Sequence, residues 1–320
     1  MSSISYDIDP GGDVEIVLKN PNTQQVVPDV ILTQPRTSRS TSPRKASYKY
    51  DPDSVEFDST CLFYDPSILS GLSAQESSEA TEIRMRVSSK HLTFASPIFK
   101  TMLEGPWSEG AASTSSVREV SATGWNAEAL AVVLNFIHNR HAQVPRHVSL
   151  LFLTYVATIV DYYHCQGAVQ ICAEMWRPTA HKYSVTWYNK RAVMWLYISW
   201  IFSWEDIFSS MVHMALAYGE GLGSAHPKDL PLAGILGKVD STRQEFIGRI
   251  LAGLDDLNEI LSTETGCVEQ NSSDCSTLAL GSLMRLRRKI DSLDPPAISP
   301  FDEYTVDNFI DMIEELYVVA

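Results

Sequence analysis

The sequence predicts an α+β protein in which a small sheet flanked by a helical cluster is followed by an all-α C-terminal region. Two observations lead to this prediction. Apolar and polar residues alternate in Asp13–Lys19 and in Ile83–Val87, as in half-buried strands. Through most of the chain after residue 88, apolar residues recur at the spacing of one helix face.

Length and composition limit the classes of function. A chain of 320 residues with 44% apolar residues has enough core to be stable alone. The net charge of −14 argues against nucleic acid as a direct partner, because a phosphate backbone requires clustered Lys and Arg. The five cysteines are an odd number at irregular spacing, which argues against a secreted disulfide framework. The first residues are too polar for a signal peptide, and the longest apolar runs are too short for a bilayer. We expect a cytoplasmic or nuclear protein with no membrane partner.

The N-terminal part contains a long insertion. Residues 1–12 are interpreted as a polar tail, and Asp13–Lys19 should pair with Ile83–Val87 across an insertion at about residues 33–81. Thr33–Lys49 is rich in Ser, Thr, Pro and Arg, a composition that predicts a disordered loop. A nuclear address, or phosphorylation at Ser42, is the alternative reading of this segment. Asp51–Leu72 is more apolar, and part of it should dock on the domain.

The stretch Ile83–Gly110 contains a strand, two helices and a stop. After the strand, Ser88 and Ser89 are both suited to begin a helix that contains Leu92 and Phe94. Ser96 and Pro97 mark a second helix start. The second helix has one apolar face and ends at Gly105-Pro106. That face consists of Ile98, Phe99, Met102 and Leu103.

The run Val87–Leu103 resembles the signature of the BTB/POZ domain, in the form common in fungal proteins. The matching positions are Leu92, Ser96, Pro97 and Phe99, with the aliphatic residues that follow. Many members carry His-Lys before the first helix, where this sequence has Ser88-Ser89 followed by Lys90-His91. The resemblance continues to about Trp176, and a weaker one to uncharacterised fungal relatives covers the helical C-terminal part. It implies protein–protein interaction rather than catalysis, and it implies a homodimer, although some members are monomers.

The remaining elements complete a BTB/POZ domain at residues 13–177 and a helical C-terminal domain at 178–320. Val117–Ser121 should form a third strand. Val148–Cys165 is apolar nearly all round, which predicts a buried helix, and the tryptophans of Tyr183–Tyr218 should lie in a core. The other helices are expected at Ala127–Asn139, Ala168–Trp176, Lys190–Phe202, Trp204–Tyr218, Ser241–Leu261, Leu278–Ile290 and Val306–Tyr317.

Catalytic patterns are not found in the sequence. It has no Gly-x-Ser-x-Gly motif, and no cysteine has a convincing histidine partner. His138, His141 and His147 lie close together, but they lack a cysteine pair or a helical His-Glu pattern that would indicate zinc. We therefore expect no catalytic residues, no cofactor and no bound metal.

A short motif suggests the partner. Trp107-Ser108-Glu109 fits the hydrophobic–any–Glu pattern by which cullin-binding BTB domains resemble one another, so Trp107 and Glu109 are the candidate partner-binding residues. Alternatively, Trp107 folds back on the domain and Glu109 is only solvated. The leading hypothesis is a non-enzymatic interaction protein, and a substrate adaptor of a cullin-type ubiquitin ligase is its sharpest form. The alternatives are a transcriptional or assembly scaffold, or a small-ligand-binding protein that uses the Trp-rich helices.

Overall fold

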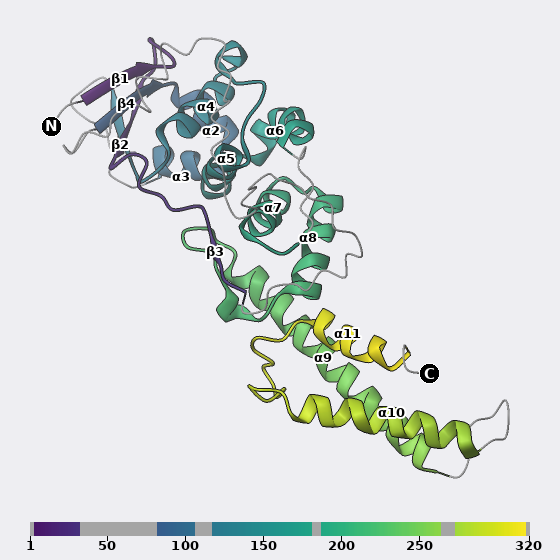
Figure 1. Ribbon diagram of the computed structural model, residues 1–320. Helices are drawn as coiled ribbons and strands as arrows, with labels where there is room; N and C mark the ends of the chain where they lie inside the picture. The colour runs from purple at the N-terminus through teal and green to yellow at the C-terminus, as the bar shows by residue number, and fades with distance from the viewer. Residues whose placement is uncertain (1–2, 33–81, 106–116, 181–186, 264–272, 318–320) are drawn as a thin grey trace, which may run out of the picture.

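The computed structural model describes residues 3–32, 82–105, 117–180, 187–263 and 273–317. Figure 1 shows a sheet at one end of the molecule, helices α7 and α8 in the middle, and helices α9–α11 at the other end. The expectations about Thr33–Lys49 and Asp51–Leu72, and those about Trp107 and Glu109, fall outside the described residues.

The sheet has four strands in the order β1-β4-β2-β5. They are β1 (Ser3–Asp7), β2 (Val14–Lys19), β4 (Glu82–Val87) and β5 (Arg118–Thr123). Strand β2 pairs antiparallel with β4, as predicted, and parallel with β5. The interpretation of residues 1–12 as a tail missed β1, which pairs parallel with β4. Its short alternation of Ile4 and Tyr6 with polar residues supplies apolar side chains toward the core.

One face of the sheet is apolar and the other is charged. Met85 of β4 lies opposite Ile16 of β2, and both are fully buried. On the outer face, Arg84 donates to Glu15 at 2.6 Å and to Glu119 at 2.9 Å. Hydrogen bonds from Arg84 to Glu119 and Glu15 raise the pKa of its guanidinium. Because these groups are partly exposed, the network fixes strand alignment more than it adds stability.

A cluster of helices covers the apolar face. It consists of α2 (Ser89–Ala95), α3 (Pro97–Glu104), α4 (Ala127–Ile137), α5 (Leu150–Tyr163) and α6 (Gln166–Ala180). A short 3-10 turn, η1 (His141–Gln143), links α4 and α5. Every helix expected from periodicity in this part is present, which confirms the predicted small sheet with flanking helices.

Helix α5 contacts helices of both parts of the molecule. It packs against α3, α4 and α6 of the first part and against α7 of the second. Most of its side chains are buried, as its nearly uniform apolar sequence predicts. A single hydrophobic core therefore runs from Tyr6 in the sheet to Leu236 in α9. The division into domains at residues 177 and 178 stays a prediction.

The second part is helical. It contains α7 (Lys190–Ile201), α8 (Glu205–Tyr218), the 3-10 turn η2 (Leu222–Ser224), α9 (Ala233–Ser262), α10 (Ser273–Asp291) and α11 (Val306–Tyr317). A two-stranded ribbon joins the parts, because β3 (Asp29–Val30) pairs antiparallel with β6 (Ala225–His226). The sequence analysis missed this ribbon, since two-residue strands leave no periodic pattern.

A second, smaller core lies between α10, α11 and the C-terminal half of α9. Ile247, Leu254, Leu283 and Phe309 are among its buried residues. Ile310 is exposed on α11, although the neighbouring Phe309 is buried. Neighbouring residues of a helix point about 100° apart, so one thin core covers only one of them.

Arg243 of α9 joins the smaller core to the rest. Its side chain is 1% exposed and forms an ion pair with Asp240 at 2.8 Å. It also donates to the carbonyl oxygens of Pro300, Phe301 and Tyr304, at 2.9, 2.9 and 2.6 Å. A buried guanidinium is stable only when its donors are satisfied, so these contacts fix the loop before α11 against α9.

The core around α3 makes a stability prediction. Phe99 is fully buried and stacks on Tyr163, with ring centroids 4.2 Å apart. Phe99→Ala should lower the free energy of unfolding by about 3–5 kcal/mol, because it leaves a cavity. Urea denaturation followed by circular dichroism measures this change.

Phe94 provides the matched control, because its side chain is 96% exposed. Phe94→Ala should change the free energy of unfolding by no more than about 0.5 kcal/mol. Equal denaturation midpoints for Phe99→Ala and the wild type would show that α3 is placed wrongly.

Candidate protein-interaction surface

Helices α2 and α3 form a surface that carries Phe94, which is the most exposed aromatic side chain among the described residues of the first part. Buried Ser96 lies between the two helices and fixes their junction. Its hydroxyl accepts from the Phe99 amide at 3.0 Å and donates to the Tyr163 carbonyl at 2.5 Å. Ser96 therefore caps α3 and ties it to the end of α5.

The start of α2 is capped from the sheet. The Asp13 carboxylate accepts from the Ser89 amide at 2.8 Å and from the Ser89 hydroxyl at 2.7 Å. Arg118 of β5 donates to the same carboxylate at 3.0 Å, and to the Leu103 carbonyl near the end of α3 at 3.3 Å. Burial raises the pKa of Asp13, but its hydrogen bonds with Ser89 and Arg118 outweigh this effect and leave the pKa lowered. One carboxylate thus holds α2, while Arg118 connects that cap to α3.

His138 supports the same junction from α4. Its Nε2 accepts from the Ser88 amide at 2.9 Å, while its Nδ1 lies 2.8 Å from the Leu134 carbonyl. This arrangement requires a neutral ring with the proton on Nδ1. Burial lowers the pKa of His138, and the nearby His91 ring lowers it further. Both ring nitrogens are therefore occupied by backbone groups, which gives His138 a structural role instead of the metal ligation weighed from sequence.

The outward side of α2 and α3 is polar except for one aromatic ring. Lys90, His91, Lys100 and Glu104 are exposed, and Phe94 lies among them with 96% of its side chain in solvent. An exposed aromatic on a rigid, capped helix is the kind of residue that dominates binding at protein interfaces.

The exposure of Phe94 was not predicted, although the sequence carries a signal for it. Leu92 and Phe94 are two positions apart, so on a short helix they point about 200° apart and cannot both face one core. Leu92 is buried, which sends Phe94 outward.

The predicted partner-binding residues Trp107 and Glu109 lie outside the described residues. The chain is described up to Gly105, whose amide donates to the Thr101 carbonyl and closes α3. The predicted stop at Gly105 is thus confirmed, while the exposure of Trp107 and Glu109 stays a prediction.

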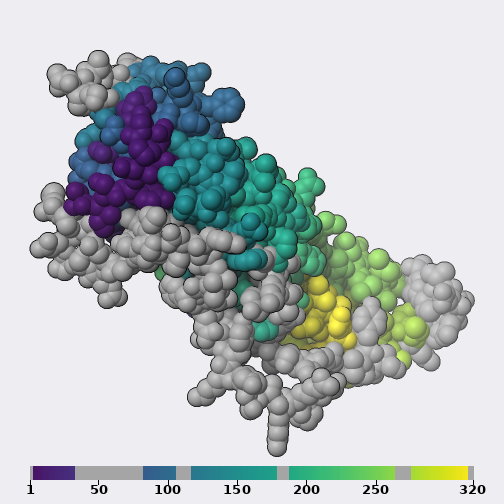
Figure 2. All heavy atoms as spheres, turned by 90° about the horizontal axis from the view of Figure 1, so that it is seen from above, coloured from purple at the N-terminus to yellow at the C-terminus, as the bar shows by residue number. Residues whose placement is uncertain are grey.

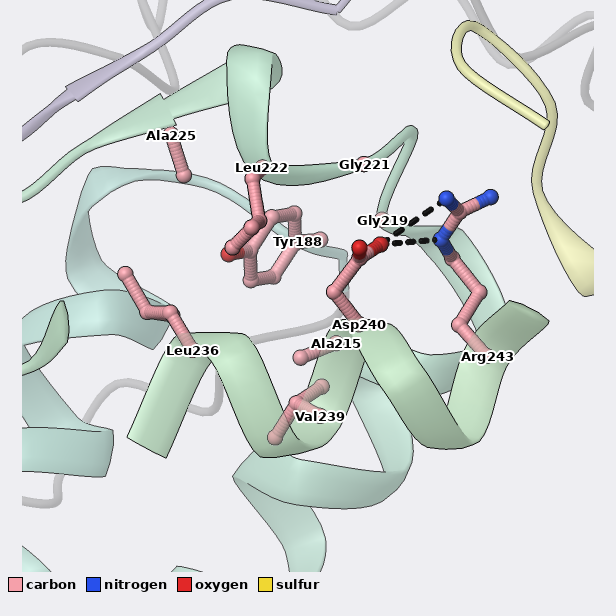
Figure 3. Close-up of a pocket in the computed structure, with 10 residues that line it drawn as sticks. All are labelled: Tyr188, Ala215, Gly219, Gly221, Leu222, Ala225, Leu236, Val239, Asp240 and Arg243. Carbon is pink, nitrogen blue, oxygen red and sulfur yellow. Dashed lines mark hydrogen bonds and ion pairs between the residues drawn. The ribbon is translucent and has the colours of Figure 1, made fainter. Parts of the chain in front are cut away.

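A small hollow lies in the helical part (Figure 3). Its lining includes Tyr188, Gly221, Leu222, Asp240 and Arg243, but no tryptophan. Figure 3 shows Asp240 and Arg243 turned toward each other, and the carboxylate also accepts from Gln244 at 2.7 Å. The Asp240 carboxylate already accepts from Arg243 and Gln244, and the Arg243 guanidinium already donates to the loop before α11. The hollow therefore offers few polar groups to a ligand.

The expectation that the tryptophans of this region lie in a core holds for Trp195 and Trp204. It was wrong for Trp187 and Trp200, which are 40% and 55% exposed. Trp195 and Trp204 are buried, with ring centroids 6.4 Å apart. Trp204 also donates its indole N–H to Glu174 at 2.8 Å, which ties α8 to α6. This packing leaves the small-ligand hypothesis without a site built from these two rings.

Cys165, which lies between α5 and α6, and Cys172 of α6 have packing roles. Cys165 and Cys172 are both buried, and burial raises the pKa of each thiol to about 12. A thiol with so high a pKa is a poor nucleophile. Among the described residues, no group of three or more His, Cys, Asp or Glu side chains is arranged to hold a metal.

Comparison with known proteins identifies the class of the first part. The family model of the BTB/POZ domain matches residues 78–179, a range that begins just before β4 and ends in the last turn of α6. The chain therefore carries a BTB/POZ domain, a protein–protein interaction module, followed by a helical C-terminal region. No match to this chain was found among curated proteins. Within the described residues, none of the helices is long and apolar enough to cross a membrane.

The environment of His138 predicts a pH-dependent stability. Because its pKa is lowered in the folded state, the unfolded chain binds a proton first as the pH falls below about 6.5. Stability is thus complete above that pH and should decrease toward about pH 5, with a slope of at most one proton. Denaturation midpoints measured across this range test it.

His138→Gln removes the titrating ring, so the stability of this variant should depend less on pH over the same range. His147→Gln is the control, because His147 is exposed and should keep the wild-type slope. Equal slopes in both variants would contradict the role assigned to His138.

Proposed function

We propose that this protein is an interaction adaptor whose BTB/POZ domain binds a cullin-type scaffold through the outward side of α2 and α3. The observation that carries the proposal is Phe94, an almost fully exposed ring on a helix whose opposite side is fixed in the core. Asp13, Ser96 and His138 hold that helix rigidly, so little conformational entropy is lost on binding.

The motif Trp107-Ser108-Glu109 adds a specific partner to this proposal. It begins two residues after Gly105, the residue that caps the end of α3, and it is the part of the chain that matches the cullin-binding pattern. In this role Trp107 fills a groove of the cullin, and the Glu109 carboxylate sets the alignment through a complementary charge. The helical C-terminal region then recruits the substrate.

A scaffold that assembles by self-association is the second candidate, and the sheet supports it. Strands β1 and β5 lie at the two edges of the described sheet, and an edge strand is a template for pairing with another chain. The two edge strands favour a homodimer, with or without a bound cullin. We place this scaffold in the cytoplasm or the nucleus.

A pull-down with purified cullin tests the adaptor. Trp107→Ala combined with Glu109→Lys should abolish capture, because it removes the aromatic anchor and reverses the charge. Phe94→Ala should weaken capture by about tenfold, without loss of stability.

Trp200→Ala combined with Glu205→Lys is the matched control. It makes the same two changes on exposed residues at the end of α7 and the start of α8, and should leave capture unchanged. If wild-type protein captures no cullin, or both double variants capture it equally, the adaptor proposal fails.

Light scattering tests self-association. At concentrations of about 10 μM we expect a mass near twice the 35.7 kDa of one chain. Ser5→Pro should disrupt pairing at the β1 edge, and Ser121→Pro should disrupt pairing at the β5 edge. The variant that carries proline at the edge that forms the dimer should therefore be monomeric. A wild-type protein that remains a monomer would argue against the dimer.

A further inference from the structure

Two of the four basic residues of α10 hold the C-terminal helices together. Arg287 forms an ion pair with Asp255 of α9, and Lys289 forms one with Glu315 of α11 at 2.6 Å. These two cations face the helices against which α10 packs. Their charges are therefore satisfied within the chain.

The other two basic residues of α10, Arg285 and Arg288, face solvent. Both are exposed, and neither side chain forms an ion pair or a hydrogen bond with another described residue. The helix dipole favours cations in the last turn, which accounts for Arg288 but not for Arg285, six residues before the end of α10 at Asp291. Two unpaired guanidinium groups thus lie one helical turn apart on a chain with a net charge of −14.

Apolar side chains lie on the same side of α10 as these arginines. Leu278 and Met284 are 74% and 52% exposed. At about 100° per residue, these two side chains and the two arginines fall within one arc of about 120° around the helix. We call this arc the outer face of α10, and all of its residues belong to one helix, so their arrangement is fixed by the helix itself.

The outer face is open among the described residues. A Cβ placed on Gly281, in the middle of the face, would meet no neighbouring atom within 4 Å. Buried Leu283 and Leu286 point the other way, into the smaller core. Asp291 is exposed at the border of the face, about 60° around the helix from Arg288, and it is the only acid in the sequence from Thr277 to Asp291. The outer face is consequently basic and apolar.

We propose that the outer face of α10 binds an acidic amphipathic segment of a partner protein. Apolar side chains of that segment would cover Leu278 and Met284, while its Asp or Glu carboxylates would pair with Arg285 and Arg288. Arginine suits this contact, because its guanidinium binds a carboxylate through two parallel hydrogen bonds. The proposal does not depend on α2, α3 or a cullin, and it assigns a recruitment role to the C-terminal helices.

Charge and position argue against other occupants. A two-fold contact between copies would place the same arginines against each other, which is unfavourable. Two free cations are too few for a nucleic acid, which requires a larger basic surface. Residues 51–72 of this chain are acidic and apolar, but they lead to β4 in the sheet. Figure 1 places the sheet at the end of the molecule opposite α9–α11, and Figure 2 shows the same separation between the purple strands and the green and yellow helices.

Fluorescence anisotropy with the full chain and labelled model peptides tests the proposal. The probe is a helix of about 18 residues with Leu on one face, Glu along its borders and Gln elsewhere, and the counter-probe has Gln in place of every Glu. At about 100 mM salt the Leu/Glu peptide should bind about fivefold more tightly than the Leu/Gln peptide. Leu278→Gln combined with Met284→Gln should weaken binding of both peptides about tenfold.

Arg285→Gln combined with Arg288→Gln should abolish the difference between the two peptides. Binding of the Leu/Gln peptide should stay as in the wild type, which shows that this variant is folded. Asp291→Asn should tighten binding of the Leu/Glu peptide about twofold, because it removes the acid at the border of the face. Lys238→Gln combined with Arg249→Gln is the matched control, because it removes two positive charges from exposed residues of α9. It should keep the wild-type difference between the peptides.

The proposal fails if neither peptide binds, or if the arginine variant and the α9 control lower binding of the Leu/Glu peptide equally. Tighter binding of a single-stranded oligonucleotide of about 20 nucleotides would overturn it in favour of a nucleic-acid site. Peptide binding that appears only after deletion of residues 51–72 would show that this chain covers the face itself. Light scattering in which Leu278→Gln/Met284→Gln alone converts an oligomer to a monomer would make the face a contact between copies.

Discussion

The burial of α5 on all sides is the constraint on which the rest of the structure depends. A helix that is apolar nearly all round must be covered from every direction, since each exposed apolar side chain loses the free energy of burial. Helices α3 and α4 cannot do this alone, so α6 and α7 cover the remaining sides. The BTB/POZ domain and the helical region are consequently joined by a shared core instead of a flexible linker.

The end of α5 also organises the interaction surface. Its last residue, Tyr163, stacks on Phe99 and accepts the hydrogen bond of Ser96. These contacts fix the inner side of α3, while Asp13 and His138 fix the start of α2 from the sheet and from α4. Because these contacts hold the inner sides of α2 and α3, the fold does not depend on burial of Phe94, which is exposed to solvent.

The opposite end of the molecule is built on a different principle. Its core is thin, and a buried polar residue, Arg243, attaches it to the rest through Asp240 and three carbonyl groups. Directional contacts of this kind set position with few apolar residues. With so thin a core, Phe246, Leu257 and Ile260 of α9 stay partly exposed.

Periodicity in the sequence by itself determined the strands β2, β4 and β5, the order of the helices and the burial of α5, because local patterns of apolar residues decide these features. The resemblance of Val87–Leu103 also determined the class of interaction domain. Only the tertiary structure decided that Ser3–Asp7 completes the sheet, that β3 pairs with β6, and that Arg243 joins two cores. It also decided which apolar residues of α9 and α11 stay exposed. Pairing between distant segments, and the choice between two adjacent helix faces, depend on neighbours that local sequence does not encode.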